Sequence, residues 1–447
     1  MNRYERYKDS GIPWLGEVPA HWDEGKLKNI CTAFGRIGFR GYSTADLVSE
    51  GEGPITLSPS NIKNTNMDYE KCTYLSWEKY LESPEIMLYK NDIVIVKTGS
   101  SYGKVGFIDD LPTEATINPQ LLVIKRININ SKYLFYILLS EIFQFQINQN
   151  VIGSTIPTIS ESKILNFNTP YPIDMNEQIT IAHYLDTKLG EIDALIGKQQ
   201  TLLEKLAEQR TAVITRAVTK GLNPTAPMKN SGVKWLGDVP AHWQLINLKF
   251  LCRVKGGYAF SSDNFSDDGI PVIRISDILF DGTVDNINCK RIPLELAPNQ
   301  KDFELRNGQL VMAMTGATIG KISKYSSEDY AYINQRVGKF EAFNSRLNYA
   351  FLYHLLNTSG YQEHIKLTAF GGAQPNISDS EMVNYQMALP TMEEQANIAD
   401  YLYQEAAKID RLCDTVNQTI GRLKEYRTAL ITQAVTGKIK VTDELRA

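Results

Sequence analysis

Two short segments place a lysine and several hydroxyl side chains between glycines, a composition found in loops that bind phosphate groups. They are TGSSYGK at residues 98–104 and TGATIGK at residues 315–321. A nucleotide-binding P-loop needs four residues between its glycines and a Ser or Thr directly after the lysine, whereas these segments have three and continue with Val105 and Ile322. We therefore predict glycine turns between strands that present groups suited to a DNA backbone. These groups belong to Thr98, Ser100, Ser101 and Lys104, and to Thr315, Thr318 and Lys321.

Other turns carry basic and amide residues beside aromatic ones. GRIGFRGY at 35–42 and VKGGYAF at 254–260 mix Arg or Lys with glycine and Tyr, and LSPSNIKN at 57–64 aligns with IRISDILF at 273–280. Such side chains bind phosphates and base edges when they lie on exposed loops. For each residue the alternative is an ordinary solvated turn. The further candidates for DNA contact are Arg36, Arg40, Tyr42, Ser60, Asn61, Lys63, Lys97, Lys255, Tyr258, Arg274, Ser276 and Gln374.

No set of residues with catalytic spacing accompanies these loops. The five histidines show no ligand spacing, and the five cysteines contain no C-x-x-C pair. NTPY at 168–171 is similar to the NPPY box of amino-methyltransferases, but Thr169 departs from it and no glycine-rich turn for a methyl-donor cofactor precedes it. We interpret 168–171 as the exit loop of a domain. The chain is predicted to recognise or to assemble rather than to catalyse, and to hold no metal or cofactor.

The composition is that of an ordinary globular protein. The 447 residues are 43% hydrophobic and 22% charged, and this length predicts two to four domains. Without an apolar run of the roughly 18 residues that cross a bilayer, and with a polar beginning, we expect a cytoplasmic protein with no membrane contact. The formal net charge is −4. Because phosphate contacts dominate DNA affinity, a DNA-binding role would need local basic patches or a charged partner.

The elements that must position these loops occur twice. SGIPWLGEVPAHW at 10–22 returns as SGVKWLGDVPAHW at 231–243, with ten of thirteen residues identical. EQITIAHYL at 177–185 likewise matches EQANIADYL at 394–402. Between these motifs the two copies have diverged, except at the glycine turns and at P-x-I-S. The diverged parts predict unlike targets, and the repeated parts predict the same partner bound twice.

The diverged segments have mixed α and β patterns. The predicted strands are the apolar runs at 92–97, 104–108, 120–125, 271–275 and 309–314. The predicted helices are at 131–148 and 347–366.

Each copy ends in a helix of about 40 residues with the alternating three and four spacing of a coiled coil. The seam residues are Leu185, Leu189, Ile192, Ile196, Gln199, Leu203, Leu206, Arg210, Val213 and Ala217, then Leu402, Ala406, Ile409, Cys413, Val416, Ile420, Leu423, Arg427, Leu430 and Ala434. Arg210 and Arg427 place a charge in this seam at equivalent positions. Either each arginine extends its head into water, or it reaches a carboxylate or carbonyl of a docked partner.

The short linker at 221–230 decides the direction of the two helices. The second diverged segment must begin at the carboxyl end of the first helix, which suits an antiparallel pair, whereas a parallel pair would need a connection of about 60 Å. The predicted fold class is therefore α+β, with two pseudo-repeated α/β domains separated by two long antiparallel coiled-coil helices. By this pseudo-symmetry, the hinge at 10–22 is expected to pack beside the end of the second helix.

The ordered set P-A-H-W, T-G-x-x-x-G-K, P-x-I-S and E-Q-x-x-I-A-x-Y-L, present twice, resembles the specificity subunits of type I DNA restriction-modification systems over essentially the whole chain. The resemblance implies the following order: a hinge segment at 1–22, a target-recognition domain at 23–172, a spacer helix at 173–221, a linker with the repeated hinge at 222–243, a second target-recognition domain at 244–389, and a distal helix with its tail at 390–447.

The resemblance also implies partners. Each recognition domain would read one half of a bipartite double-stranded DNA site, and the helices would dock two modification (methyltransferase) subunits, with Arg210 and Arg427 as candidate contacts. Restriction subunits with translocase and nuclease activity would join that core, and the methyl donor, ATP and Mg²⁺ are expected on the partner subunits. Two other functions stay open: a coiled-coil scaffold that binds no DNA, and a self-contained DNA methyltransferase, for which the required motifs are absent.

Overall fold

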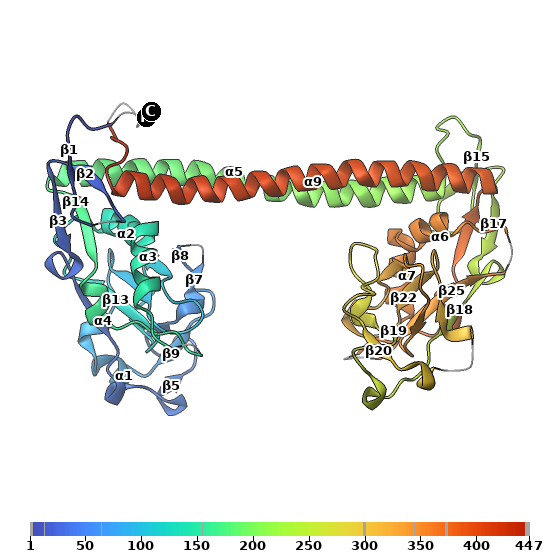
Figure 1. Cartoon of the computed structure of the whole chain (residues 1–447), viewed down its shortest axis with the longest axis horizontal. Helices are drawn as coiled ribbons and strands as arrows, with labels where there is room; N and C mark the ends of the chain where they lie inside the picture. The colour runs from blue at the N-terminus through green and yellow to red at the C-terminus, as the bar shows by residue number, and fades with distance from the viewer. Residues whose placement is uncertain are drawn as a thin grey trace. The chain divides into compact units, whose positions relative to one another are not determined.

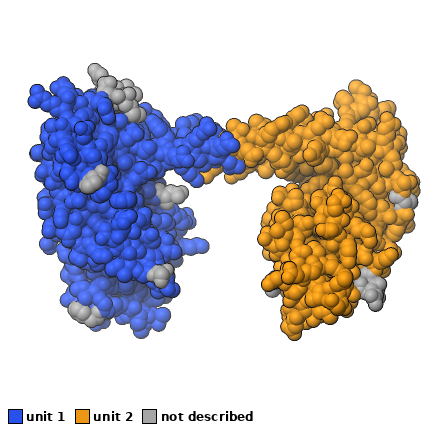
Figure 2. All heavy atoms as spheres, in the orientation of Figure 1, with its two compact units in different colours: residues 1–199, 417–447 blue, residues 200–416 orange. Residues whose placement is uncertain are grey.

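The structure, a computed structural model, describes residues 3–12, 14–63, 65–153, 155–297, 301–343, 345–371 and 374–442. It consists of two compact units (Figure 2). Unit 1 joins Met1–Gln199 to Asn417–Ala447, and unit 2 is Gln200–Val416. Each unit therefore contains one diverged segment together with parts of both long helices.

Unit 1 is built on two four-stranded sheets. The first is antiparallel, with the order β11 (Val105–Phe107), β10 (Ile93–Val96), β13 (Leu121–Lys125) and β4 (Thr32–Gly35). The second has the order β12 (Ala115–Ile117), β6 (Ile55–Leu57), β9 (Thr73–Leu75) and β5 (Leu47–Val48), and its β12 and β6 are parallel. Of the apolar runs predicted as strands in this unit, 92–97 and 120–125 contain the central strands β10 and β13 of the first sheet, and 104–108 contains its edge strand β11.

Unit 2 repeats the first sheet and the parallel pair of the second sheet. Its antiparallel sheet has the order β23 (Ile322–Lys324), β22 (Leu310–Ala313), β25 (Val337–Ala342) and β18 (Cys252–Gly256). Its second sheet has the order β20 (Lys290–Ile292), β19 (Ile270–Ile273), β24 (Ala331–Ile333) and β21 (Glu304–Leu305), with β19 and β24 parallel. The diverged segments thus share one fold despite their unlike sequences.

The predicted single helix in each unit is wrong, because each is two helices. They are α2 (Ser131–Leu139) and α3 (Glu141–Asn150) in unit 1, and α6 (Tyr349–Leu356) and α7 (Ser359–Thr368) in unit 2. Ser140 ends α2 with extended backbone, and its hydroxyl accepts from Phe143 N to cap α3. Thr358 caps α7 in the same way. A hydroxyl residue at these positions offers the backbone a cap in place of a continuing helix.

Short strand pairs enclose each diverged segment. In unit 1, β3 (Trp22–Lys26) pairs with β14 (Asn168–Pro172), and in unit 2, β17 (Gln244–Asn247) pairs with β26 (Gln386–Leu389). Residues 168–171, interpreted above as an exit loop, are therefore part of a strand. Among the described residues, the other short α-helices are α1 (Trp77–Leu81), α4 (Glu161–Leu165) and α8 (Asp379–Val383).

The two long helices are α5 (Met175–Lys220) and α9 (Met392–Val435). They are antiparallel within each unit (Figure 1), because the first part of α5 packs on the last part of α9 in unit 1 and the reverse holds in unit 2. Seam residues such as Leu189 and Leu430 are buried in one core, and Ala217 and Leu402 in the other. The predicted coiled-coil seam is confirmed. Among the described residues no helix is both long and apolar enough to cross a membrane.

Each hinge forms a joint with the end of a long helix. In unit 1, β1 (Tyr7–Asp9) and β2 (Glu17–Pro19) form a hairpin, and Lys438 Nζ donates to Leu15 O at 3.0 Å. In unit 2, β15 (Met228–Asn230) pairs with β16 (Asp238–Pro240), and Lys220 Nζ donates to Leu236 O at 3.3 Å. The first hinge does lie beside the end of α9, as the pseudo-symmetry predicts.

The E-Q pair at the start of each long helix completes the joint. Glu177 accepts from Trp22 Nε1 at 3.0 Å, and Glu394 accepts from Trp243 Nε1 at 3.2 Å. The neighbouring glutamines bind the loops that enter α2 and α6, since Gln178 Oε1 accepts from Asn130 N at 2.7 Å and Gln395 Oε1 accepts from Asn348 N at 2.8 Å. The repeated residues therefore fasten each diverged domain to its own helix segments.

Candidate nucleic-acid interface

The glycine turns are hairpin turns between strands, as predicted. Residues 98–104 join β10 to β11, and residues 315–321 join β22 to β23. Each turn lies against the P-x-I-S segment of its own unit, since Gly99 N donates to Pro157 O at 3.0 Å and Gly316 N donates to Pro375 O at 2.9 Å. The two motifs that survived divergence are therefore in direct contact.

The candidate residues divide by exposure. Seven side chains are exposed: Ser60, Lys63, Ser100, Lys104, Tyr258, Ser276 and Gln374. Nine are half-buried: Arg40, Tyr42, Lys97, Thr98, Ser101, Lys255, Arg274, Thr318 and Lys321. Arg36, Asn61 and Thr315 are buried. Only the first two groups present atoms that a DNA molecule can reach in this conformation.

Arg36 is a structural residue in unit 1. It is 4% exposed, and its guanidinium donates to Ile117 O at 3.1 Å and to Thr116 Oγ1 at 3.2 Å. Burial lowers the pKa of this guanidinium from its ordinary value. Its Cζ lies 5.3 Å from the ring centroid of Tyr42. Arg36 was expected to extend from the first basic loop toward DNA, but its hydrogen bonds instead fasten that loop to β12.

Asn61 and Thr315 are also engaged inside the protein. Asn61 Oδ1 accepts from Ser58 N at 2.9 Å, and its amide donates to Asp68 O at 2.9 Å. In unit 2 the equivalent residue is Asp277, which accepts from Arg274 N at 2.9 Å. Thr315 donates to Pro375 O at 3.2 Å. These side chains shape the loops and leave their neighbours Ser60 and Ser276 on the surface.

Several candidate cations already have carboxylate partners. Lys63 pairs with Asp68, Lys97 with Glu161 at 3.7 Å, Arg40 with Glu85 at 3.5 Å, and Arg274 with Asp277 at 3.4 Å. The partner Asp68 raises the pKa of Lys63. The more exposed of these pairs, such as Lys63 with Asp68, contribute little to stability. Their pairing accounts for how cationic loops coexist with an acidic chain.

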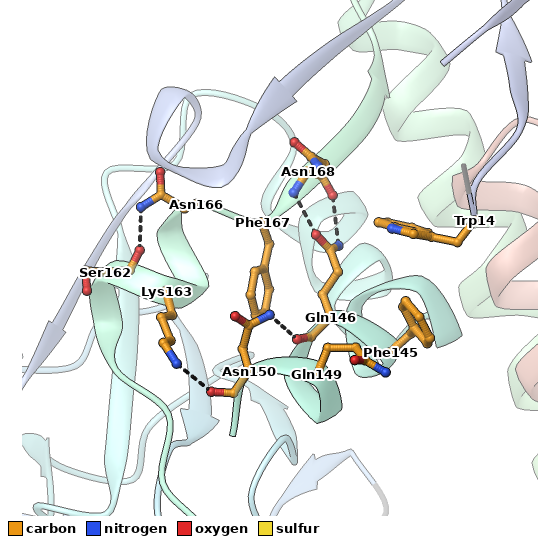
Figure 3. Close-up of a pocket in the computed structure, with 10 residues that line it drawn as sticks. All are labelled: Trp14, Phe145, Gln146, Gln149, Asn150, Ser162, Lys163, Asn166, Phe167 and Asn168. Atoms are coloured by element: carbon orange, nitrogen blue, oxygen red, sulfur yellow. Dashed lines mark hydrogen bonds between the residues drawn. The ribbon is translucent and has the colours of Figure 1, made fainter. Parts of the chain in front are cut away.

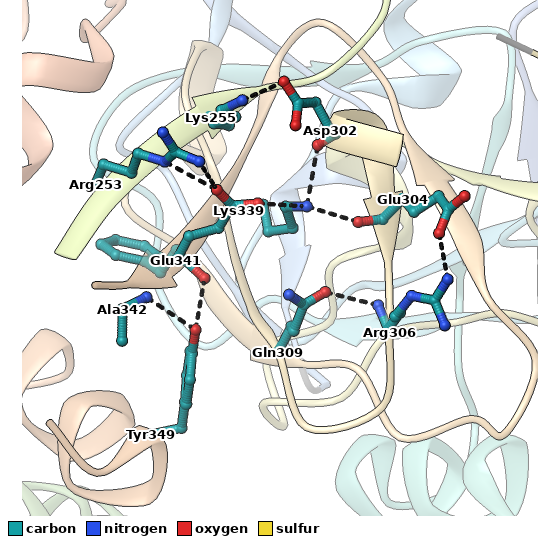
Figure 4. Close-up of polar contacts among 11 residues, drawn as sticks. Arg253, Lys255, Asp302, Glu304, Arg306, Gln309, Lys339, Glu341, Ala342 and Tyr349 are labelled. Carbon is teal, nitrogen blue, oxygen red and sulfur yellow. Dashed lines mark hydrogen bonds and ion pairs between the residues drawn. The ribbon is translucent and has the colours of Figure 1, made fainter. Parts of the chain in front are cut away.

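Lys255 belongs to a larger polar cluster (Figure 4). Its ammonium pairs with Asp302, whose main-chain oxygen accepts from the buried Lys339 at 3.0 Å. Lys339 also lies 2.8 Å from Glu341 Oε1, and Arg253 Nη2 lies 2.9 Å from Glu341 Oε2. This network ties β18 and β25 to β21, so Lys255 acts first as part of the framework of unit 2.

Sequence reasoning missed Phe280, which stands on the surface of unit 2. Its side chain is 88% exposed, and Lys321 Nζ lies 3.9 Å from its ring centroid. Ser323 Oγ fastens the preceding turn by donating to Leu279 O at 3.1 Å. The alignment of 57–64 with 273–280 placed Phe280 at the end of a candidate loop, and an aromatic residue on a turn was the available signal.

A pocket of about 400 Å³ lies beside the first hinge (Figure 3). Its aromatic wall is Trp14 and Phe145, whose ring centroids are 5.7 Å apart. The polar side chains around it bind one another: Gln146 exchanges two hydrogen bonds with the backbone of Asn168, and Lys163 Nζ donates to Asn150 O at 3.0 Å. The pocket lies where α3, α4 and β14 meet, and its polar side chains hold these elements together.

The two seam arginines have partners within the chain. Arg210 Nη2 lies 2.7 Å from Asp410 Oδ1 in unit 2, and Arg427 Nε lies 3.1 Å from Asp193 Oδ1 in unit 1. From the sequence, each arginine was expected either to reach water or to contact a docked partner, and an aspartate of the facing helix was not predicted. Contact of these arginines with a partner subunit stays a prediction. In the part of the chain that the structure describes, no three His, Cys, Asp or Glu side chains gather closely enough to hold a metal ion.

Comparison with known proteins decides the family. The model of the type I restriction modification DNA specificity domain matches residues 19–205 and 240–421, one match for each copy of the repeat. The chain belongs to this family. It is 24% identical over 368 residues to the type I restriction enzyme MjaVIII specificity subunit of Methanocaldococcus jannaschii, covering 81% of this chain and 82% of that protein. It is 22% identical over 437 residues to the EcoKI specificity subunit of Escherichia coli K12, covering 95% and 90%.

Solved structures share the fold of this type I specificity family member. A chain from a study of complex assembly and conformational transition in a type I R-M system aligns with a TM-score of 0.66 at 17% identity, covering 94% of this chain and 99% of that one. An HsdS subunit from Thermoanaerobacter tengcongensis aligns with a TM-score of 0.53 at 16% identity, covering 94% and 98%. The predicted α+β fold with repeated domains is confirmed.

Family membership also settles the class of function. The matched domain is a DNA specificity domain and the relatives are specificity subunits, so this chain is a DNA-recognition subunit of a type I restriction-modification system and not a catalytic one. Such subunits work in complexes with methyltransferase and restriction subunits and DNA. The prediction that the chain recognises rather than catalyses is therefore confirmed.

Proposed function

We propose that each diverged domain reads one half of a bipartite double-stranded DNA site. The observation that carries the proposal is that both units place unlike side chains on the same frame. At equivalent positions of the two loops, Ser60 and Ser276 are both exposed, but the first loop continues to Lys63 while the second continues to Phe280. A shared frame with unlike exposed residues suits two different half-sites.

The surface atoms of these loops suit both kinds of DNA contact. Hydroxyl and amide groups such as those of Ser60, Ser276 and Gln374 donate to and accept from base edges, and the ammonium of Lys63 reaches phosphate. An exposed Phe packs against thymine methyl groups. The hydroxyl groups of the glycine turns that are exposed or half-buried, those of Thr98, Ser100, Ser101 and Thr318, would contact the DNA backbone.

We further propose that the antiparallel helices set the distance between the half-sites and dock two methyltransferase subunits. The helix segments in the two units are repeats of one another, so each offers the same surface once. Exposed apolar side chains on α5 and α9, including Leu195, Leu202 and Leu412, leave surface for such a partner. Restriction subunits would join this core. The methyl donor, ATP and Mg²⁺ would then be bound by the partner subunits, and the complex would act on DNA in the cytoplasm.

One experiment tests the proposal against a scaffold that binds no DNA. Methylated bases are mapped genome-wide in cells that carry the complete system with and without this gene. The proposal requires a bipartite motif, two short specific sequences around an unspecified spacer, that is methylated only when the gene is present. Methylation that is the same in both strains would favour the scaffold.

A further inference from the structure

We infer that Lys104 and Lys321 are positioning residues: each holds the reading loop of its own domain in place from the glycine turn. The reading loop of unit 1 is residues 58–63 and 65–68, and that of unit 2 is residues 274–285. This inference rests on the proposed function, because it assigns to these loops the contact with DNA. It removes the two lysines from the expected phosphate contacts. The repeated T-G-x-x-x-G-K motif then serves to hold the lysine that binds the reading loop.

The same hydrogen bond occurs in both units. Lys104 Nζ donates to Ile62 O at 3.1 Å, and Lys321 Nζ donates to Ile278 O at 2.7 Å. Each acceptor belongs to the residue directly after the loop-shaping Asn61 or Asp277. The two domains have diverged through most of this region, yet the lysine meets the carbonyl at the equivalent position. Two independent copies of one contact are not expected from a lysine that merely points into solvent.

The lysine stands on a rigid base in each turn. Gly103 O accepts from Gln144 Nε2 at 2.9 Å, and Gly320 O accepts from Gln362 Nε2 at 3.0 Å, so helices α3 and α7 grip the turn just before the lysine. Gly103 and Gly320 have φ angles of 80° and 82°, in the region that favours glycine. A Cβ on Gly103 would lie 2.7 Å from Gln144 Oε1. The motif residues thus fix the backbone at the lysine, and from this fixed position the lysine side chain reaches the reading loop.

The other ties of the reading loops differ between the two units. In unit 1, Asn61 fastens the start of the reading loop to Ser58 and its end to Asp68, and β7 (Ile62–Lys63) pairs with β8 (Asn66–Met67) in a sheet of two strands. In unit 2, the corresponding strands form a single bridge between Ile278 and Val284. The Asn61 amide also donates to Lys71 O at 3.2 Å, just past the loop, and in unit 2 β23 holds the loop at two further places, since Ser323 Oγ donates to Leu279 O at 3.1 Å and Lys324 N donates to Gly282 O at 2.9 Å. The lysine is the side-chain link from loop to sheet that occurs at the equivalent position of both units, through β11 in unit 1 and through β23 in unit 2.

Lys321 has a second contact that follows from the first. Its ammonium lies 3.9 Å from the ring centroid of Phe280, which is close enough for a cation–π interaction. The lysine therefore orients the most exposed aromatic side chain of the second reading loop as well as its backbone. Loss of Lys321 would release the Phe280 ring and the Ile278 carbonyl, while Ser323 and Lys324 would still hold Leu279 and Gly282.

Positioning and phosphate contact make different predictions about salt. Removing a lysine that neutralises one phosphate lowers the magnitude of the slope of log K against log salt by about 1. The removal also weakens binding to all DNA sequences alike. A lysine that holds a reading loop leaves the slope unchanged and weakens discrimination at the half-site read by its own domain.

The test uses the full chain assembled with its methyltransferase subunits. The variants are Lys104→Met and Lys321→Met, with Lys104→Arg and Lys321→Arg as conservative changes that keep a donor, and Lys290→Met as a matched change at an exposed lysine of β20. Backbone amide exchange of the free full chain is measured first, because it needs no DNA. We expect the Met variants to speed exchange about tenfold in the reading loop of the altered unit only, and the Arg variants to restore most of the protection.

DNA binding of the same proteins completes the test. We expect Lys104→Met to lose about tenfold in preference at one half-site and Lys321→Met to lose at least tenfold at the other, each with the wild-type salt slope. A slope that falls by about 1 with both half-site preferences intact would overturn the inference in favour of phosphate contact, and so would unchanged amide exchange. A wild-type complex that selects no DNA sequence would instead contradict the proposed function. The amide exchange result would still decide whether the lysine holds the reading loop.

Discussion

Arg427 of α9 donates to Asp193 of α5, with Nε 3.1 Å from Oδ1, inside unit 1. The equivalent residues pair in unit 2, where Arg210 Nη2 lies 2.7 Å from Asp410 Oδ1. The donor is on α9 in one pair and on α5 in the other, as a two-fold repeat of antiparallel helices requires. A charge in the seam is therefore matched by a carboxylate of the facing helix.

Replacing both arginines by leucine tests whether the pairs matter beyond the helices. Both pairs are partly exposed, so we expect the free energy of unfolding to change by less than about 1 kcal/mol. Because the arginines already have partners, affinity for the methyltransferase subunit should also stay at the wild-type value, measured by calorimetric titration. Arg422→Leu, an exposed arginine of α9, is the control. Partner affinity lost in the double variant alone would return Arg210 and Arg427 to the docking surface.

Glu177→Ala should destabilise the first hinge. Trp22 is 1% exposed and its indole N–H donates to Glu177, which also accepts from Tyr4 Oη at 2.7 Å. Truncation leaves a buried donor without an acceptor, which costs about 1–3 kcal/mol. Urea unfolding of the full chain measures this loss, with Glu191→Ala on the exposed face of α5 as the control. Equal stability of the two variants would show that the hinge does not depend on this carboxylate.

His354 should make unit 2 sensitive to mild acid. Burial, and secondarily the charge of Arg210, lowers its pKa from 6.5 to about 4. The unfolded chain binds the proton below pH 6.5, but the folded chain binds it only below about pH 4, so stability falls as the pH falls through this window. The full loss is about 3 kcal/mol. His354→Phe should flatten the dependence of unfolding free energy on pH between 6.5 and 4, and His183→Phe, at an exposed histidine of α5, serves as the comparison. Identical pH profiles for wild type and His354→Phe would contradict the assignment.

The helices should act as a ruler. Inserting seven residues after Gln199 and seven after Val416 adds two turns to each helix, keeps the heptad register, and lengthens the pair by about 10 Å. We expect the unspecified spacer of the methylated motif to grow by about three base pairs, read by mapping methylated bases. Four residues inserted after Gln199 alone would move the seam residues off their partners and should instead impair assembly. A spacer that keeps its length in the seven-residue variant would exclude the ruler.

The sequence predicted the parts of this fold that depend on local pattern. The heptads of α5 and α9, the buried central strands and the glycine turns all follow from residue type and spacing, and the repeat with its short linker gave the antiparallel direction. The break between α2 and α3 at Ser140 was missed. A single hydroxyl residue inside an apolar helical pattern can either cap a new helix or point to solvent, and the sequence pattern is the same in both cases.

The candidate DNA contacts were harder to predict because charge and loop context do not reveal a partner. Arg36 stands among glycines as a phosphate-binding residue would, yet it donates to the carbonyl of Ile117 and the hydroxyl of Thr116, on a strand about 80 residues away. Asp193 and Asp410 were hidden for the same reason, since only the antiparallel register brings them to the seam arginines. Phe280 could be recognised as exposed only after the turn around it was known.

The central claim is that each diverged domain reads its own half of the DNA site. Residues 244–389 are exchanged for the corresponding segment of a relative with a different target, and methylated bases are mapped in cells carrying the otherwise complete system. The account predicts a hybrid motif in which one half-site changes to that of the relative while the other half-site stays as in wild type. A motif in which both half-sites change would contradict it.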